Sequence, residues 1–296
     1  MADTLEVEVG KRRFELGHPA KALFPADGIT KSDLLAYYRE VAPAMLPHLA
    51  DRPLMLQRFP DGIEAGGFYQ KDAPDYFPDW IRRVRMRKEG GTLDHVVCND
   101  EATLAYLASQ ACITLHPWLS RADRPDRPDQ VVFDLDPSGA DFGLVRRAAQ
   151  TLCGMLDEMG LASFPKTTGS SGLHVVIPVE RRQGFEATRR FAEEVGSRLA
   201  ASDPSHLTTE ARKSKRGGRI FIDVGRNAYA QTAVAPYAVR ALPGAPVAAP
   251  LERDELSDPA LTPRRYTVAN MASRLAERGD LWAAIADHSR QRLPRL

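Results

Sequence analysis

Segments with the periodicity of strands and segments with the periodicity of helices alternate along most of this 296-residue chain. Strand-like stretches lie at 5–9, 54–59, 81–88, 131–137, 173–179 and 219–224, and helix-like stretches lie at 31–45, 100–112, 142–159 and 184–201. The last 40 residues are expected to hold one or two helices. Because the sequence contains no internal repeat and no flexible linker, this alternation predicts one compact α/β or α+β unit.

The composition excludes several classes of protein. The chain has 40 Lys and Arg residues and 39 Asp and Glu residues, so its net charge of +1 does not by itself indicate a nucleic-acid or membrane partner. No run approaches 18 apolar residues, and the charged N-terminus lacks the apolar stretch of a signal peptide. Three cysteines without CxxC spacing argue against a disulfide framework or a cysteine zinc site. We therefore expect a cytoplasmic protein without a membrane partner.

Two strand-like segments carry acidic side chains that can share one face. Alternate residues of a strand face the same side, so within 131–137 Asp134 and Asp136 point together away from the apolar positions. Within 220–224, Asp223 is placed in the same way. If these strands are neighbours, three carboxylates converge and can hold two Mg²⁺ or Mn²⁺ ions about 3.5–4 Å apart, an arrangement that serves phosphoryl transfer. A second interpretation stays open, in which the acids form a solvated strand edge before a turn.

A turn rich in glycine and serine precedes His174. Gly169 and Gly172 let the backbone turn tightly, while Thr168 and Ser170 offer hydroxyl and amide groups to phosphate oxygens, which makes both of them candidate nucleotide-binding residues. His174 is placed to donate to a triphosphate, or is a core histidine satisfied by the backbone. The absence of GK[ST] and of GxSxG argues against a Walker A loop and against a serine hydrolase.

Further candidates for contact with nucleic acid are basic or aromatic. A basic loop at 212–219 runs into the strand of Asp223, where a charge run that is usually a solvated face can instead contact phosphates. Lys21 and Lys31 are able to grip a terminal phosphate, or are ordinary surface lysines. The adjacent residues 68 and 69 are aromatic: in a loop one can stack on a base, whereas in a strand one belongs to the core.

Six segments, taken in order, resemble the polymerase domain of bacterial DNA ligase D, a branch of the archaeo-eukaryotic primase superfamily. They are HPAKALFPADGITKSDLLAYY, GFYQKDAPDYFPDW, FDLDP, TTGSSGLHVVIP, RGGRIFIDVGRN and TAVAPYAVR. The resemblance covers His18 to Asp258 and implies a primase-type catalytic core with an RRM-like sheet. It implies a single domain over 1–296, with an end-phosphate-binding part at about 1–120, the catalytic core at about 128–245 and helices at about 250–296.

The resemblance also implies roles for individual residues. The metal ligands and catalytic residues would be Asp134, Asp136 and Asp223. The residues at the incoming nucleotide and its template would be Ser170, His174, Arg216, Arg240, Phe68, Tyr69, Arg58 and His116. The 5′-phosphate of a DNA end would be held by Lys21 and Lys31.

The activity implied is template-directed nucleotide addition to DNA ends and gaps during non-homologous end joining. Two Mn²⁺ or Mg²⁺ ions would be the cofactors, and the substrates would be NTP or dNTP. DNA ends and gapped duplex with a 5′-phosphate would be the partners, together with a Ku-type protein and a separate ligase, in a nucleoid-associated setting. The chain lacks a KxDG ligase motif, so we expect a stand-alone polymerase or an excised domain. It departs from many relatives at Gln57, Tyr69, Ser171 and Gln231, which bears on nucleotide affinity and sugar preference but leaves the three acids intact.

Two other functions were weighed against nucleotide addition. A DNA-end-binding module that bridges breaks with little catalysis would rest on Lys21, Lys31 and the arginines at 82–88. A metal-dependent nuclease would keep the acids, but it has no need for the Gly/Ser-rich turn and His174 beside a triphosphate.

Overall fold

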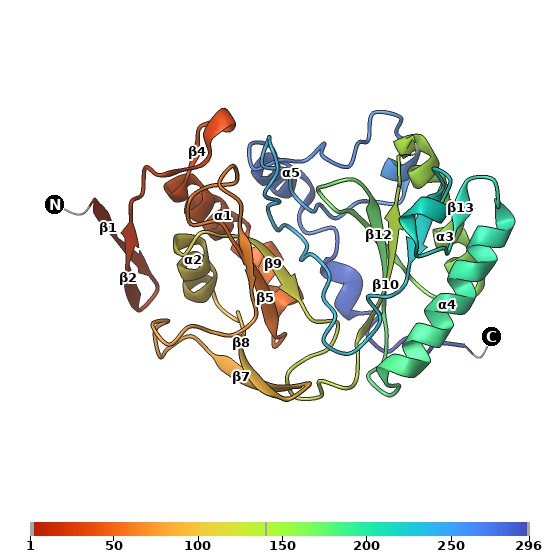
Figure 1. The fold of residues 1–296 in the computed structure, drawn as a ribbon, viewed down its shortest axis with the longest axis horizontal. Helices are drawn as coiled ribbons and strands as arrows, with labels where there is room; N and C mark the ends of the chain where they lie inside the picture. Colours follow the sequence, from red (N-terminus) through yellow and green to blue (C-terminus); the bar gives the residue numbers. More distant parts are fainter. Residues whose placement is uncertain (1–2, 140, 295–296) are drawn as a thin grey trace. The chain divides into compact units, whose positions relative to one another are not determined.

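The computed structural model describes residues 3–139 and 141–294, and these fall into two compact units. The first unit comprises Met1–Trp118, Val234–Val247 and Tyr266–Gly279, and the second comprises Leu119–Ala233, Ala248–Arg265 and Asp280–Leu296. The mixed helix-and-sheet class expected from the sequence is confirmed (Figure 1). The expectation that 1–296 forms one domain stays a prediction, and its outermost residues, 1–2 and 295–296, lie outside the described residues.

The first unit combines short sheets with three α-helices. Its strands are β1 (Thr4–Val9), β2 (Arg12–Gly17), β3 (Ala22–Phe24), β4 (Ile29–Thr30), β5 (Leu54–Arg58), β6 (Phe68–Gln70), β7 (Arg83–Lys88), β8 (Gly91–Val96) and β9 (Cys112–Pro117). Its helices are η1 (Pro25–Asp27), α1 (Lys31–Leu49), α2 (Glu101–Ser109) and α5 (Met271–Arg278). Pairs β1–β2, β3–β4 and β7–β8 are antiparallel, and a three-stranded antiparallel sheet has the order β6-β5-β9.

Helix α1 begins where the sequence predicts. The Thr30 side chain accepts a hydrogen bond from the Asp33 backbone N–H, and the Asp33 carboxylate accepts one from the Thr30 N–H. This reciprocal cap satisfies backbone donors that a helix start leaves open. The helix continues beyond the expected end to Leu49 and packs against α2 and α5.

The second unit is built on one five-stranded sheet with the order β11-β12-β10-β14-β13. Its strands are β10 (Gln130–Asp136), β11 (Phe164–Thr167), β12 (Leu173–Pro178), β13 (Leu207–Thr208) and β14 (Ile220–Asp223). Its helices are α3 (Phe142–Glu158), α4 (Phe185–Ser202), η2 (Lys213–Lys215), η3 (Asp254–Ser257) and η4 (Ala283–Ala286). All neighbouring strands run antiparallel except β13 and β14, which are parallel.

Helices α3 and α4 pack on the sheet of the second unit, and the small residue Gly196 lets α4 come close to it. A methyl group added at Gly196 would lie 3.4 Å from the Ile222 side chain, so α4 covers the side of β14 that Ile222 faces. Side chains alternate along a strand, so Asp223, the next residue, projects from the opposite face of the sheet.

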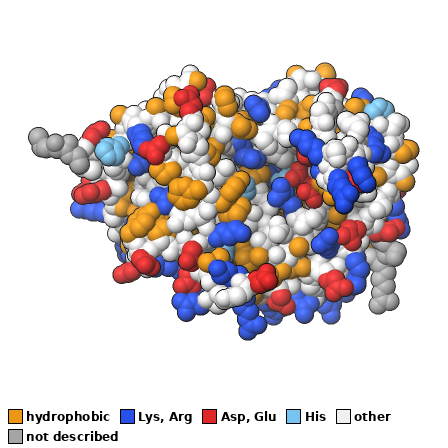
Figure 2. All heavy atoms as spheres, in the orientation of Figure 1, with side chains coloured by type: hydrophobic (Ala, Val, Ile, Leu, Met, Phe, Trp, Pro, Cys, Tyr) orange, Lys and Arg blue, Asp and Glu red, His pale blue; other side chains and the backbone are white. Residues whose placement is uncertain are grey.

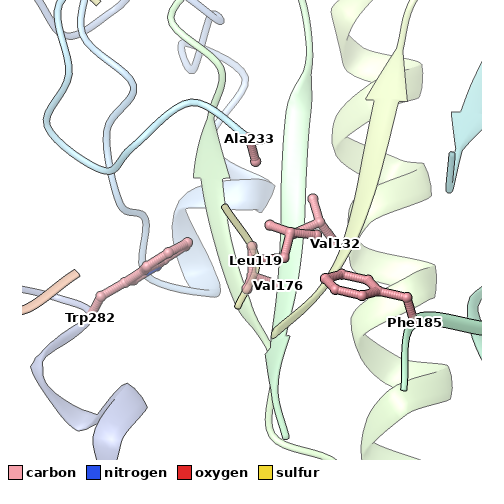
Figure 3. Packing of buried hydrophobic residues seen from close by; sticks show 6 residues of the cluster. All are labelled: Leu119, Val132, Val176, Phe185, Ala233 and Trp282. Atoms are coloured by element: carbon pink, nitrogen blue, oxygen red, sulfur yellow. The ribbon is translucent and has the colours of Figure 1, made fainter. Parts of the chain in front are cut away.

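A buried apolar cluster packs around Val132 and Val176, which are paired across β10 and β12. Figure 3 shows these two side chains and Leu119 between Trp282 and Phe185. The Trp282 indole N–H donates to the Pro165 carbonyl at 3.1 Å, so its polar atom is satisfied although the side chain is only 2% exposed.

Several strands were not expected from the sequence, and two of them are almost wholly buried. Residues 112–117 form β9, and residues 164–167 form β11, which is fully paired with β12. Both segments are almost wholly buried, so neither shows the alternation of apolar and polar residues that reveals a half-exposed strand.

Candidate active site

Four side chains from adjacent strands lie in one row across the sheet of the second unit. Lys166 of β11 is opposite His174 of β12, which is opposite Asp134 of β10, which is opposite Asp223 of β14. Directly opposed residues in antiparallel strands project to the same face. Asp136 follows two positions after Asp134 and therefore shares that face. The strand register thus places the three predicted acids on one face of neighbouring strands.

Asp134 is the most enclosed of the three acids. Its Oδ2 atom lies 3.4 Å from Nε2 of His174 and accepts a hydrogen bond from Nε of Arg226 at 3.1 Å. Burial alone would raise the pKa of Asp134, but His174 and Arg226 reverse that effect and hold the pKa well below its usual range. Burial lowers the pKa of His174 to about 4, an effect that Asp134 opposes and Lys166 strengthens. His174 is therefore neutral near pH 7, so Arg226 supplies the positive charge that keeps Asp134 ionised there.

The other two acids have different partners. Arg216 donates to Asp136 at 3.3 Å and to the Ser138 hydroxyl at 3.0 Å. Its guanidinium lies over the Phe221 ring at 3.9 Å, a cation–π contact that fixes its direction. Asp223 accepts a hydrogen bond from the Gly225 backbone N–H at 2.7 Å.

The chemistry of these donors fits a hard divalent cation, because Mg²⁺ and Mn²⁺ prefer carboxylate oxygens. In the arrangement described for residues 3–139 and 141–294, however, no three His, Cys, Asp or Glu side chains are grouped closely enough to hold an ion. Asp134 and Asp136 each pair with an arginine instead. A cation bound here would therefore compete with Arg216 and Arg226 for the same carboxylates.

The Gly/Ser-rich turn is closed by Thr168. Its hydroxyl accepts the Gly172 backbone N–H at 3.1 Å and lies 3.0 Å from the Ser170 hydroxyl, and its backbone N–H donates to the Gly172 carbonyl. Gly169 has φ +66°, a left-handed conformation that glycine adopts without strain. His174 follows as a buried residue whose Nδ1 atom has no hydrogen-bond partner within the described chain. Thr168, Ser170 and His174 thus lie together between the end of β11 and the start of β12.

Gly172 is required where this turn meets β10. A methyl group at this position would lie 2.2 Å from the Leu135 carbonyl oxygen, and that oxygen belongs to the central strand of the sheet. We expect Gly172→Ala to lower the free energy of unfolding by about 2–3 kcal/mol, measured by urea denaturation.

The control is Gly154→Ala in the middle of α3, where an added methyl group meets no atom within 4 Å. This change should be neutral or stabilise by up to about 1 kcal/mol through helix propensity. Equal effects of the two substitutions would show that close packing at Gly172 is not the cause.

Aromatic residues of the first unit gather around Arg58. Phe68 and Tyr69 lie in β6, an edge strand, and both are exposed, at 48% and 59%. The expectation that one of them would be core if they lay in a strand is therefore wrong, because β6 pairs only with β5. The Arg58 guanidinium lies 5.7 Å from the centre of the Phe68 ring, and the Tyr69 ring meets the His116 ring edge-on at 6.0 Å. Four of the predicted residues thus come together on the β6-β5-β9 sheet.

The predicted phosphate-binding lysines are neighbours in the first unit. The Lys31 backbone N–H donates to the Lys21 carbonyl at 2.9 Å, and the Lys31 ammonium donates to the Gly17 carbonyl at 2.7 Å. Burial lowers the pKa of Lys31, and the charges of Lys21 and Arg58 add to that effect. Because the protein as a whole is near neutral and its charges are interspersed over the visible face (Figure 2), such local groups of cations must carry any attraction for phosphates.

Arg240 also belongs to the first unit. Its backbone N–H donates to the Pro246 carbonyl at 2.7 Å, and the preceding Val239 is fixed by hydrogen bonds to the hydroxyl groups of Tyr38 and Thr114. This segment is thereby held against α1 and β9.

Three residues that the sequence reasoning missed lie at these sites. Lys166 and Arg226 contact or face the acid row, and Tyr76 accepts a hydrogen bond from Arg58 at 2.7 Å beside the exposed aromatic residues. The available signal was weak, since each is a single basic or aromatic residue close to a motif. Only the strand register and the packing bring them to the site.

The fold and the site agree with one family of proteins. The model of the LigD primase-polymerase domain matches residues 30–282 of the chain. This match covers well over half of the sequence, and the chain belongs to the LigD primase-polymerase domain family.

Several known proteins are similar to this chain. The multifunctional non-homologous end joining DNA repair protein LigD of Mycobacterium tuberculosis is 34% identical over 92% of this chain. The bifunctional non-homologous end joining protein LigD of Bacillus subtilis is 32% identical over 88%. The chain spans 37% and 42% of the lengths of these two relatives. A solved structure of the polymerase domain of M. tuberculosis ligase D in complex with DNA superposes with a TM-score of 0.89 at 33% identity, over 94% of this chain and all of that one.

None of the helices in the described ranges is both long and apolar enough to cross a membrane.

Proposed function

We propose that this chain is a template-directed nucleotidyltransferase that adds nucleotides to a primer 3′-hydroxyl at DNA ends and gaps during non-homologous end joining. The observation that carries the proposal is the row of His174, Asp134 and Asp223 across three adjacent strands, with Asp136 on the same face. Membership of the LigD primase-polymerase family and the repair role named for the relatives support it.

Different residues of the second unit would bind the phosphates and the metal ions of a nucleotide substrate. The hydroxyl groups of Thr168 and Ser170 would bind phosphate oxygens, and Nδ1 of His174 would donate to one when the imidazole is protonated. Arg216, once released from Asp136, would neutralise triphosphate charge. Asp134, Asp136 and Asp223 would hold two Mn²⁺ or Mg²⁺ ions. When bound, such ions activate the attacking hydroxyl and neutralise charge on the reacting phosphates.

The residues of the first unit would bind nucleic acid and the nucleotide base. Phe68 and Tyr69 offer exposed ring faces on which a base can stack, a contact worth about 1–3 kcal/mol. Arg58, His116 and Arg240 would line the nucleotide site. A Ku-type end-binding protein and a separate ligase are the protein partners that the family resemblance leads us to expect.

The test is incubation of a 5′-phosphorylated gapped duplex with NTP or dNTP and Mn²⁺, followed by gel analysis of the primer. Lengthened primers that match the template support the proposal, and comparison of the two nucleotide types measures the sugar preference. Shortened primers would instead support a metal-dependent nuclease, and unchanged primers would contradict the proposed nucleotidyltransferase activity.

A second candidate function, binding of DNA ends with little catalysis, is favoured by the adjacent lysines Lys21 and Lys31. We expect Lys21→Ala/Lys31→Ala to weaken binding of a 5′-phosphorylated gap by about 10- to 100-fold, since each phosphate contact is a charge-assisted hydrogen bond. Binding of the same duplex with a 5′-hydroxyl should change much less. Fluorescence anisotropy at fixed salt measures both, and equal losses on the two duplexes would contradict recognition of the end phosphate.

A further inference from the structure

A carboxylate stands directly at one of the two proposed phosphate-binding lysines. Asp61 Oδ1 accepts a hydrogen bond from the Lys21 ammonium at 2.6 Å. The two residues are 40 positions apart, and the Asp61 side chain is 75% exposed. A surface pair of this kind adds little to stability, because side-chain entropy and water oppose it. A competing anion can therefore displace Asp61 from Lys21 at little cost in stability.

The loop that carries Asp61 is fixed against the strand that follows Lys21. The Gly62 backbone N–H donates to the Phe59 carbonyl at 3.1 Å, and the Ile63 N–H donates to the Leu23 carbonyl at 2.9 Å. Gly62 has φ +84°, and a methyl group there would lie 3.1 Å from the Ala22 carbonyl oxygen. Backbone contacts on both sides thus place Asp61 beside Lys21.

The charges around this point are unbalanced. Lys21 and Arg58 are close enough to Lys31 to lower its pKa, so three cations act on one another within the first unit. Asp61 is paired with Lys21, whereas the Lys31 ammonium is directed to the Gly17 carbonyl. The group therefore keeps an excess of positive charge that a more highly charged anion can use.

We propose that Asp61 occupies the place of the end phosphate in the free protein and must be displaced from Lys21 when a DNA 5′-phosphate binds. This inference rests on the proposed role of Lys21 in end recognition and deepens it. A terminal phosphate monoester carries a charge of about −1.5 to −2 at neutral pH, more than one carboxylate or one backbone phosphodiester. Asp61 thereby competes with the end phosphate for Lys21, and its displacement lowers the affinity for a 5′-phosphorylated end.

The experiment measures the affinity of the full chain for a gapped duplex with a 5′-phosphate or a 5′-hydroxyl, by fluorescence anisotropy at one fixed salt concentration. We expect Asp61→Asn to tighten binding of the 5′-phosphorylated duplex by about 3- to 10-fold. The substitution frees Lys21 and removes a negative charge that repels the phosphate, while the side chain keeps nearly the same size and shape. Binding of the 5′-hydroxyl duplex should change by less than about twofold.

Glu64→Gln is the matched control, since Glu64 is an exposed acid on the same loop and the substitution changes the net charge equally. If Glu64→Gln and Asp61→Asn tighten binding equally on both duplexes, the effect is one of net charge and the inference is overturned. A double-mutant cycle provides a second readout: in a Lys21→Ala background, Asp61→Asn should no longer affect binding.

The outcomes separate this inference from the proposed function. A wild-type protein without preference for the 5′-phosphate would contradict end recognition itself, and with it the role of Asp61. A preference that Lys21→Ala abolishes and Asp61→Asn leaves unchanged would overturn the role of Asp61 alone.

Discussion

The double variant Asp134→Asn/Asp136→Asn is expected to lower the rate of nucleotide addition on a gapped duplex by on the order of 10³-fold or more. Both side chains keep their size but lose the charge that faces Arg226 and Arg216 and that would hold divalent cations. DNA-end binding should be retained within a few-fold, because the lysines proposed for it belong to the other unit. Single-turnover primer extension and anisotropy measure the two effects separately.

Asp123→Asn is the matched control for this variant. Asp123 is an acid of the same unit that also pairs with an arginine, Arg181, through two hydrogen bonds, but it lies on an exposed loop. Its loss should leave the rate of addition within about twofold, as for most surface ion pairs. A double variant of Asp134 and Asp136 that is as active as this control would refute the carboxylate centre.

Trp282→Ala is expected to lower the free energy of unfolding by about 3–5 kcal/mol. The indole fills the space beside Val132 and Val176, meets the Phe164 ring edge-on and donates to the Pro165 carbonyl. Its removal leaves a cavity beside these residues and one hydrogen bond fewer at the Pro165 carbonyl, which still accepts from the Leu251 N–H. Thermal unfolding followed by circular dichroism should show a midpoint lower by about 8–15 °C.

Trp282→Phe separates the two contributions in this core. It retains most of the packing and loses the hydrogen bond, so its cost should be well below that of Trp282→Ala. If both variants unfold at the wild-type temperature, the cluster of Figure 3 does not support the sheet as described.

The acid centre was the part of the site that the sequence predicted best. Strand periodicity alone places Asp134 and Asp136 on one face, and the same argument places Asp223. That β10 and β14 are neighbours does not follow from periodicity, because pairing depends on contacts distant in sequence. The structure supplies it, with Asp134 directly opposite Asp223. The cap of α1 at Thr30 was predictable for a similar reason, since capping is local.

Features that depend on tertiary contacts could not be predicted from the sequence. The exposure of both Phe68 and Tyr69 follows from the edge position of β6, which no local pattern reveals. Lys166 reaches the acid row only through the pairing of the buried strand β11, and Asp61 meets Lys21 only because its loop binds back to β3. Each of these side chains is ordinary in its own stretch of sequence, so its role becomes visible only once the strands are paired.

Binding of Mn²⁺ in the presence of nucleotide, measured by electron paramagnetic resonance with wild-type protein and with Asp223→Asn, tests the central claim most directly. Free Mn²⁺ gives a signal that is lost on binding, so the measurement does not depend on catalysis. We predict saturable binding to the wild-type protein and a loss of about 10-fold or more in affinity when one carboxylate ligand is removed. Equal binding by the two proteins would contradict the proposal that acids from β10 and β14 hold the ions together.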